Sequence, residues 1–435
     1  MYDEHNRGQF HFSARRGWIN DPNAPLWYDG VYHLYFQHNP DGLAWGNLHW
    51  GHATSPDLVH WTEQPIALRP DLHPGNLYSG GGVVDTENVS GLRSGDHAPI
   101  LLYSGTDGVT LFYSTDGGYT FHTYDNGRSV AVPEGKSRDP KVFRHEPTGR
   151  WCMVIWSDHS GYGVDFFTSP NFLDWTFASR YPAAWLYECP DLIPLPLDGN
   201  LNWVLNGASG EYVVGDFDGR AFTTAHPEPQ RFNHGTNHPG GDYYAGLTFA
   251  NLPDDRAISI AWQGGNAGSV WTGNLTFPVQ FRLRVVDGVP KVLSTPIAEL
   301  DDLRETTLTW ADVRLDTDRT LTGAAVCTVE AEFHIEEGTT RVGFRVGPRE
   351  VAYDTATATL DGVPMPPDGD TVKIQLLVDR GQLEIFGNDG LVYKSLNADL
   401  GGDRLDVFAD GGAHLVKLVF SPLHSIWQTG QRSIS

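Results

Sequence analysis

The sequence is poor in the features that define several common protein classes. Only three of its 435 residues are cysteine, an odd number without zinc-type spacing, which argues against a disulfide framework. No stretch approaches the roughly 18 consecutive apolar residues of a membrane span. Basic residues are scarce, with 30 Lys and Arg against 54 Asp and Glu and a formal net charge of −24. This charge excludes nucleic acid and anionic membranes as partners, because both would repel the protein.

The N-terminal residues lack the basic segment and apolar run of a signal peptide. The sequence is therefore compatible with two cellular locations. The protein is cytoplasmic if Met1 is the native start, and it is secreted if a leader was removed. The sequence leaves the oligomeric state open as well.

Long patterns with the period of a helix are rare, whereas short strand-like runs between turn signals recur, which predicts an all-β fold. Within them lies a weak repeat, in which a strand is followed by a tight polar turn and then by an aromatic residue. Its copies cover 54–61, 114–121, 168–175 and, more loosely, 215–222. Repeats spaced by about 45–60 residues favour the blades of a β-propeller over a sandwich with coincidental turns.

The pattern changes after Pro278, where aromatic residues thin out and β-branched alternation takes over, as in 329–335 and 371–378. Residues 387–390 (Gly-Asn-Asp-Gly) are a hairpin signal, and 294–303 could form a short connecting helix. We therefore expect two domains. A propeller that carries the chemistry would cover 1–298, and a β-sandwich without chemistry of its own would cover 299–435.

Three short strings place a carboxyl group immediately before a proline, or with one residue between the two. They are 18–23 (Trp-Ile-Asn-Asp-Pro-Asn), 137–140 (Ser-Arg-Asp-Pro) and 187–190 (Tyr-Glu-Cys-Pro). Proline fixes its own φ and favours an extended residue before it, so we expect each acid at a rigid, extended strand end. Three rigid carboxyl groups suit chemistry on a neutral, oxygen-rich substrate, and glycoside cleavage is the obvious candidate.

Cleavage with retention needs an ionised nucleophile and a protonated carboxyl group about 5–5.5 Å apart. Asp21 is flanked by asparagine amides, so we expect it to be held ionised among donors. Glu188 follows an apolar stretch, so we expect a less polar setting in which it keeps its proton. Asp139 would bind sugar hydroxyls, with Arg138 beside it as a donor.

Together and in this order, the three strings resemble those of glycoside hydrolase family 32, the β-fructosidases that include invertases, levanases and inulinases. The resemblance implies that Asp21 is the nucleophile, Asp139 the transition-state stabiliser and Glu188 the general acid/base. It also implies a five-bladed β-propeller followed by a C-terminal β-sandwich, a site in the central funnel, and no metal or cofactor in catalysis. Two departures from the family pattern are Ala24, where glycine is usual, and Gly81, where serine is frequent.

Further strings are similar to the substrate-binding strands of that family. Gln37, Trp45 and Trp50 would build the sugar pocket, while Tyr244 and Trp271 would form its rim or contact the next sugar. Trp61 is expected in the core. The full set of expected substrate-binding residues is Asn20, Gln37, Trp45, Trp50, Ser79, Arg138, Tyr244 and Trp271.

The resulting hypothesis is an exo-acting enzyme that releases fructose from terminal β-fructofuranosyl units of fructans, fructo-oligosaccharides or sucrose. Asp21 would attack the anomeric C2 while Glu188 protonates the leaving oxygen and then activates water. The alternatives are a fructosyltransferase with a sugar acceptor, an endo-acting fructanase, a propeller glycosidase for arabinan or xylan, and a carbohydrate-binding protein without turnover. The preferred linkage and the preference for polymer or sucrose stay open.

Overall fold

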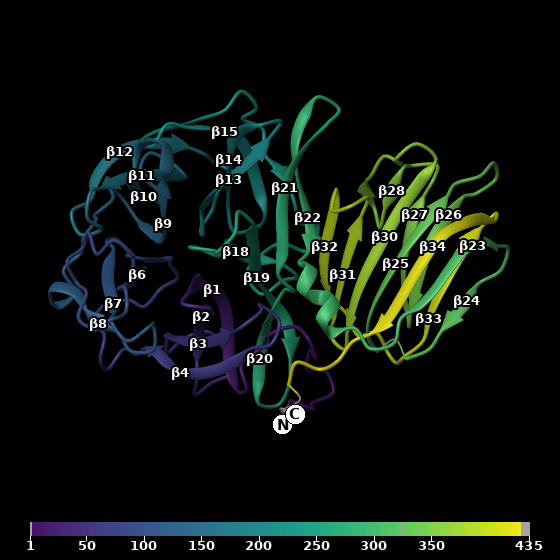
Figure 1. The fold of residues 1–435 in the computed structure, drawn as a ribbon, viewed down its shortest axis with the longest axis horizontal. Coiled ribbons are helices and arrows are strands. Elements are labelled where there is room, and N and C mark those ends of the chain that lie inside the picture. The colour runs from purple at the N-terminus through teal and green to yellow at the C-terminus, as the bar shows by residue number, and fades with distance from the viewer. Residues whose placement is uncertain (1, 324, 428–435) are drawn as a thin grey trace.

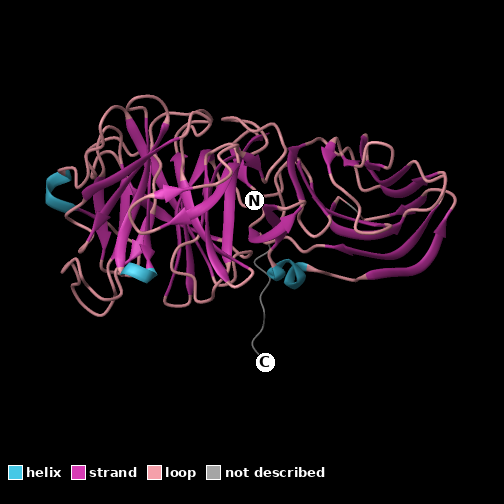
Figure 2. Cartoon of the chain, turned by 90° about the horizontal axis from the view of Figure 1, so that it is seen from above, coloured by secondary structure: helices cyan, strands magenta, loops and turns pink. Residues whose placement is uncertain are grey.

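The computed structural model describes residues 2–323 and 325–427, and almost all of its regular structure is strand. The chain forms a ring of small sheets that is followed by two packed sheets, and the two parts lie side by side (Figures 1 and 2). No helix in the described ranges is long and apolar enough to cross a membrane. The predicted all-β fold, a propeller and then a sandwich, is confirmed.

The ring contains four sheets, of which the nine-stranded one combines strands from the start and from the end of this part of the chain. Along the chain, the strands of these sheets follow one another in five groups. The first contains β1 (Gly17–Tyr28), β2 (Val31–Asn39), β3 (His49–Ser55) and β4 (Thr62–Leu68). The second contains β5 (Gly82–Val84), β6 (Ile100–Ser104), β7 (Thr110–Ser114) and β8 (His122–Thr123), followed by the 3-10 helix η1 (Tyr124–Gly127). The third contains β9 (Ser137–His145), η2 (Glu146–Thr148), β10 (Arg150–Ser157), β11 (Gly163–Ser169) and β12 (Thr176–Pro182).

The fourth group contains β13 (Asp191–Leu197), β14 (Asn200–Asn206), β15 (Glu211–Phe217), β16 (Phe222–Thr223) and β17 (Gln230–Arg231). The fifth contains β18 (Tyr244–Thr248), β19 (Ala257–Ala267), β20 (Trp271–Leu275), β21 (Val279–Val286) and β22 (Val289–Pro296). Strand β20 pairs in parallel with β1, which closes the ring. The count of five blades stays a prediction, and this grouping is what supports it.

The sequence repeat coincides with the end of the third strand in four of these groups. After β3, β7, β11 and β15, an Asp or Asn side chain accepts hydrogen bonds from two backbone N–H groups further along the turn. These acceptors are Asp57, Asp116, Asn171 and Asp218. Such turns reverse the chain tightly. The aromatic residue that follows packs inward in three of them, and Trp61 lies in the core as expected.

The second part is a sandwich of two six-stranded sheets. One sheet contains β23 (Leu308–Leu315), β25 (Val326–His334), β30 (Thr371–Asp379), β31 (Gln382–Gly387), β32 (Val392–Asn397) and β34 (Ala413–Pro422). The other contains β24 (Arg319–Leu321), β26 (Arg341–Val346), β27 (Arg349–Asp354), β28 (Thr359–Leu360), β29 (Val363–Pro364) and β33 (Leu405–Asp410). The predicted hairpin at 387–390 joins β31 to β32.

The connection between the two parts is the 3-10 helix η3 (Ala298–Leu303), within the stretch expected to be helical. The division at 298/299 stays a prediction, and it falls in this connection.

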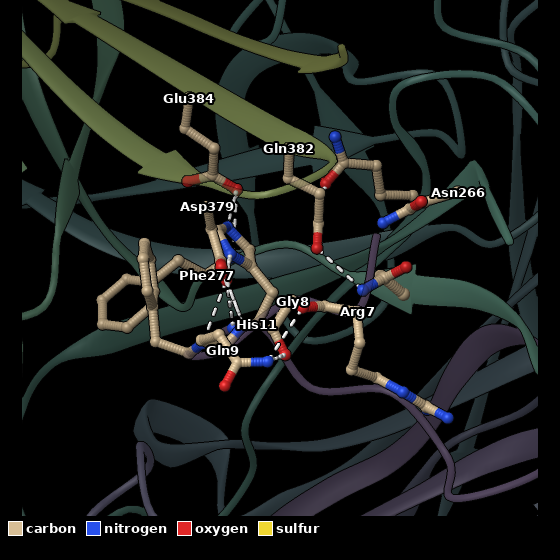
Figure 3. A network of polar contacts seen from close by, with 12 residues as sticks. Arg7, Gly8, Gln9, His11, Asn266, Phe277, Asp379, Gln382 and Glu384 are labelled. Carbon is tan, nitrogen blue, oxygen red and sulfur yellow. Dashed lines mark hydrogen bonds and ion pairs between the residues drawn. The ribbon is translucent and has the colours of Figure 1, made fainter. Parts of the chain in front are cut away.

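A buried polar network also joins the parts (Figure 3). Asp379 of the sandwich accepts hydrogen bonds from the backbone N–H groups of Gln9 and Phe10 and lies 2.9 Å from His11 Nδ1. The N-terminal segment is thereby fixed between the two parts.

Candidate active site

The three acids reach one place from three different strand groups. Asp21 lies within β1, Asp139 lies near the start of β9, and Glu188 lies three residues before the start of β13. The first strands of neighbouring groups contact one another around the axis of the ring, as β1 does with β5 and β18. Cys189, the residue after Glu188, contacts the other two acids: its Sγ lies 3.8 Å from Asp21 Oδ2 and 3.6 Å from Asp139 Oδ2. Asp21 and Asp139 thus both lie beside the residue that follows Glu188 in the sequence.

The backbone at two of the acids differs from the expected extended form. Asp139 has φ 61° and Cys189 has φ 44°, although both precede a proline, and Glu188 has φ 60°. The prediction of extended geometry is wrong at these positions. Left-handed backbone is costly for residues other than glycine and persists where surrounding contacts enforce it, often at functional sites.

Asp21 lies among donors, as expected. Ser79 donates its hydroxyl to Asp21 Oδ2 at 2.5 Å, and the Asn20 amide donates to Oδ1 at 3.1 Å. The carboxyl group is buried, and burial raises its pKa to about 6, although these two hydrogen bonds lower it. Asp21 is therefore mostly ionised at neutral pH.

Asp139 is the most strongly perturbed of the three acids. Its Oδ2 accepts a hydrogen bond from the backbone N–H of Cys189 at 3.0 Å. Burial, and then the negative charges of Glu188 and Asp21, hold its pKa well above the usual range for a carboxyl group. Arg138 is only a distant partner of Asp139, at 3.9 Å. Asp139 thus keeps its proton more readily than an ordinary carboxyl group.

Glu188 has a more polar setting than the sequence indicated. Arg138 Nε donates to Oε1 at 2.8 Å, and the Tyr244 hydroxyl donates to Oε2 at 2.7 Å. The expectation of an apolar environment is wrong, because these donors come from the third and fifth strand groups, far from the apolar stretch before Glu188. Its side chain is 21% exposed against 7% for Asp139. Glu188 is thus the more accessible of these two acids.

The expected sugar-pocket residues divide into exposed and buried ones. Trp45 is 60% exposed, and its ring lies 6.4 Å from that of Tyr78. Trp50 is fully buried and donates its indole N–H to the Tyr78 carbonyl. Trp271 is 1% exposed, with the Arg7 guanidinium 4.4 Å from its ring. Rings without exposed surface have no face to offer a sugar, so Trp50 does not cover a sugar ring as expected, and Trp271 does not lie at an exposed rim.

Gln37 is also buried, and its amide donates to the Leu77 carbonyl at 2.9 Å. It supports the chain that carries Ser79. A small hollow of about 10 Å³ lies beside the acids. Its lining includes Asp139, Ser79 and the prolines that follow the three acid strings, namely Pro22, Pro140 and Pro190.

Sequence reasoning missed an aromatic wall next to Glu188. Tyr162 and Tyr187 are 45% and 41% exposed, and their rings lie 5.3 Å apart. Arg138 lies over Trp156, with 4.2 Å between its Cζ and the ring. Tyr187 belongs to the third acid string and could have been found there. Tyr162 lies in a glycine-flanked turn that carries no sequence signal.

A β-propeller that gathers three carboxyl groups at its axis, with exposed aromatic rings beside them, has the architecture and donor set of a glycoside hydrolase. Residues 11–296 match the glycosyl hydrolases family 32 N-terminal domain. The chain belongs to this family and is a glycoside hydrolase.

The chain is also similar to named enzymes and to a solved enzyme structure. The chain is 33% identical to a levanase of Bacillus subtilis (strain 168), over 98% of this chain and 72% of that protein. It is 29% identical to the extracellular exo-inulinase inuE of Aspergillus niger, over 89% of this chain and 88% of that protein. The crystal structure of exo-inulinase from Aspergillus awamori superposes with a TM-score of 0.86 at 25% identity, covering 98% and 100% of the two chains.

Proposed function

We propose that this protein is a retaining exo-fructosidase that releases fructose from terminal β-fructofuranosyl units of levan- or inulin-type fructans, fructo-oligosaccharides or sucrose. The observation that carries the proposal is the convergence of Asp21, Asp139 and Glu188 around Cys189 in a family 32 chain. The names of the relatives, levanase and exo-inulinase, support the substrate class.

In this proposal Asp21 attacks the anomeric C2 of the terminal unit. Its donors Ser79 and Asn20 keep the carboxylate ionised and fix its orientation. Attack forms a C2–O bond to Asp21 and breaks the bond from C2 to the leaving oxygen. Water later breaks the ester, and the two inversions at C2 give net retention.

Glu188 supplies the proton to the leaving oxygen. The greater exposure of Glu188 relative to Asp139 suits it for contact with the leaving oxygen of a substrate. Arg138 and Tyr244 hold its two oxygens and fix its orientation. In the second step the same carboxylate takes a proton from water.

Asp139 stays beside the reacting carbon and binds ring hydroxyls. A hydrogen bond that a ring hydroxyl donates to the Asp139 carboxyl group strengthens as positive charge develops on the ring, which favours the transition state over the bound substrate. On the other side, Trp45 and the wall formed by Tyr162 and Tyr187 offer ring faces to the leaving sugar.

Product analysis on sucrose, inulin and levan, side by side, tests the proposal. We expect free fructose as the first product from each accepted substrate, without intermediate-length fragments. Glu188→Gln should lower the rate by about 10²–10⁴-fold, the range for loss of a general acid/base. Short oligomers as first products would indicate endo action, and longer oligomers at high sucrose would indicate fructosyl transfer. Full activity of Glu188→Gln would overturn the proposed mechanism.

A further inference from the structure

A buried ion pair lies directly behind the acids, where neither the family comparison nor the proposed chemistry uses it. Lys141 and Asp191 are 5% and 1% exposed, and Lys141 Nζ lies 3.5 Å from Asp191 Oδ2. Lys141 Nζ also donates to the Thr248 carbonyl, while the backbone N–H and the hydroxyl of Thr248 donate to Asp191 Oδ2 at 2.8 and 2.6 Å. Three strand groups thus meet in one closed set of polar contacts.

The place of this pair in the ring is distinctive. At other junctions, backbone hydrogen bonds connect the inner strands of neighbouring groups. Ala24 N–H donates to the Gly80 carbonyl, Gly81 N–H to the Pro140 carbonyl, and Trp27 N–H to the Ala250 carbonyl. Between the third group and the fourth, side chains take part in the connection. Lys141 contacts Asp191 there, in addition to the hydrogen bonds of Arg138 with Glu188 and of Cys189 with Asp139.

The pair is close to the catalytic groups along the chain. Lys141 is two residues after Asp139, with only Pro140 between them, and Asp191 is three residues after Glu188, beyond Cys189 and Pro190. Each of these short segments contains a proline, whose fixed φ limits how far the segment can flex. A change in the spacing of Lys141 and Asp191 therefore moves Asp139 and Glu188 relative to each other.

Gly81, where the family pattern frequently has serine, lies next to this connection. A Cβ at this position would lie 2.9 Å from the Pro140 carbonyl oxygen and 3.1 Å from Lys141 Cα. Glycine lets the second strand group approach the backbone that carries both Asp139 and Lys141, so it leaves this connection undisturbed.

We propose that Lys141 and Asp191 are a positioning pair that sets the separation of Asp139 and Glu188 across the junction of the third and fourth strand groups. The inference rests on the proposed roles of these two acids. The pair touches no substrate, and it acts through the two short chain segments that connect it to the acids. Its charges cancel, so it adds no net charge beneath the three carboxyl groups.

The decisive variant is Lys141→Met with Asp191→Asn, which removes both charges and leaves an amide oxygen to accept from Thr248. Removing only one partner would strand a buried charge and destabilise the protein. We expect kcat to fall about 10- to 100-fold while KM changes by less than about 3-fold, since a misplacement near 1 Å costs up to about 10²-fold in rate. The acid limb of the pH profile of kcat/KM should shift as well.

Two further variants separate positioning from mere stability. Asp379→Asn removes an equally buried carboxylate at the interface of the two domains, and it should lower the melting temperature while keeping kcat within about 2-fold. Thr248→Val removes one donor to Asp191 and leaves every charge in place. It should lower kcat several-fold, and Thr248→Ser should restore it.

Retention of parental kcat and pH profile in the double variant, or in Thr248→Val should the double variant not fold, would overturn the inference. Glu188→Gln distinguishes this from a failure of the proposed function. If Glu188→Gln is inactive while the double variant is fully active, only the positioning role of Lys141 and Asp191 is wrong. If Glu188→Gln is active, the assigned roles of the acids are wrong.

Discussion

Ser79 and Asp21 form a 2.5 Å hydrogen bond between two strand groups at the centre of the ring. The serine precedes the second group, and the aspartate belongs to the first. This hydrogen bond opposes the effect of burial, which raises the pKa of Asp21 to about 6. Ser79 thus controls the pH range in which the nucleophile is ionised.

Replacing this serine should therefore move the acid limb of the activity profile. In the parent enzyme, kcat/KM should decline as the pH falls through about 6, because Asp21 takes up a proton. Ser79→Ala removes a donor to the ionised form, so the pKa rises and the limb moves to higher pH. Profiles of initial rates on sucrose measure the shift. Ser114→Ala removes a similar bond to Asp116 in an outer turn, and it should leave the limb in place.

Trp45 should contribute to substrate binding with little contribution to folding. Its ring is 60% exposed, so Trp45→Ala should leave the melting temperature almost unchanged. Loss of one aromatic contact of about 0.5–1.5 kcal/mol should raise KM for an oligosaccharide by about 2- to 10-fold. Phe177→Ala provides the control, since Phe177 is 53% exposed on the outer strand β12. Equal effects of both variants on KM would refute a sugar contact at Trp45.

His11 should make the stability of the protein depend on pH. Burial lowers the pKa of His11, but hydrogen bonds and charges of Asp379 and Glu384 outweigh this and raise it to about 9 (Figure 3). A group with a raised folded pKa stabilises fully below its unfolded value near 6.5 and loses that contribution as the pH rises through about 9. The contribution is about 3 kcal/mol.

Denaturant unfolding at several pH values checks this expectation. The difference in unfolding free energy between the parent and His11→Gln should be largest below pH 6.5 and should shrink toward pH 9. A difference that stays constant over this range would show that His11 does not change its protonation on folding.

The strand architecture and the acids could be predicted from the sequence because both leave local signals. The repeated turn acceptors, such as Asp57 and Asp116, stand at fixed places after a strand. The setting of Glu188 could not be predicted, because Arg138 and Tyr244 reach it from other strand groups. The burial of Trp271 depends on Arg7, which is hundreds of residues away, and no local pattern indicates that contact.

The assignment of Asp21 as nucleophile is most directly tested by trapping the glycosyl-enzyme. A fructosyl donor with a good leaving group should accumulate the ester in Glu188→Gln, because release needs the missing base. After acid quench and proteolysis, mass spectrometry should locate one fructosyl unit on the peptide that carries Asp21. A fructosyl unit on Asp139, or rapid turnover without any adduct and with inverted product, would contradict the account.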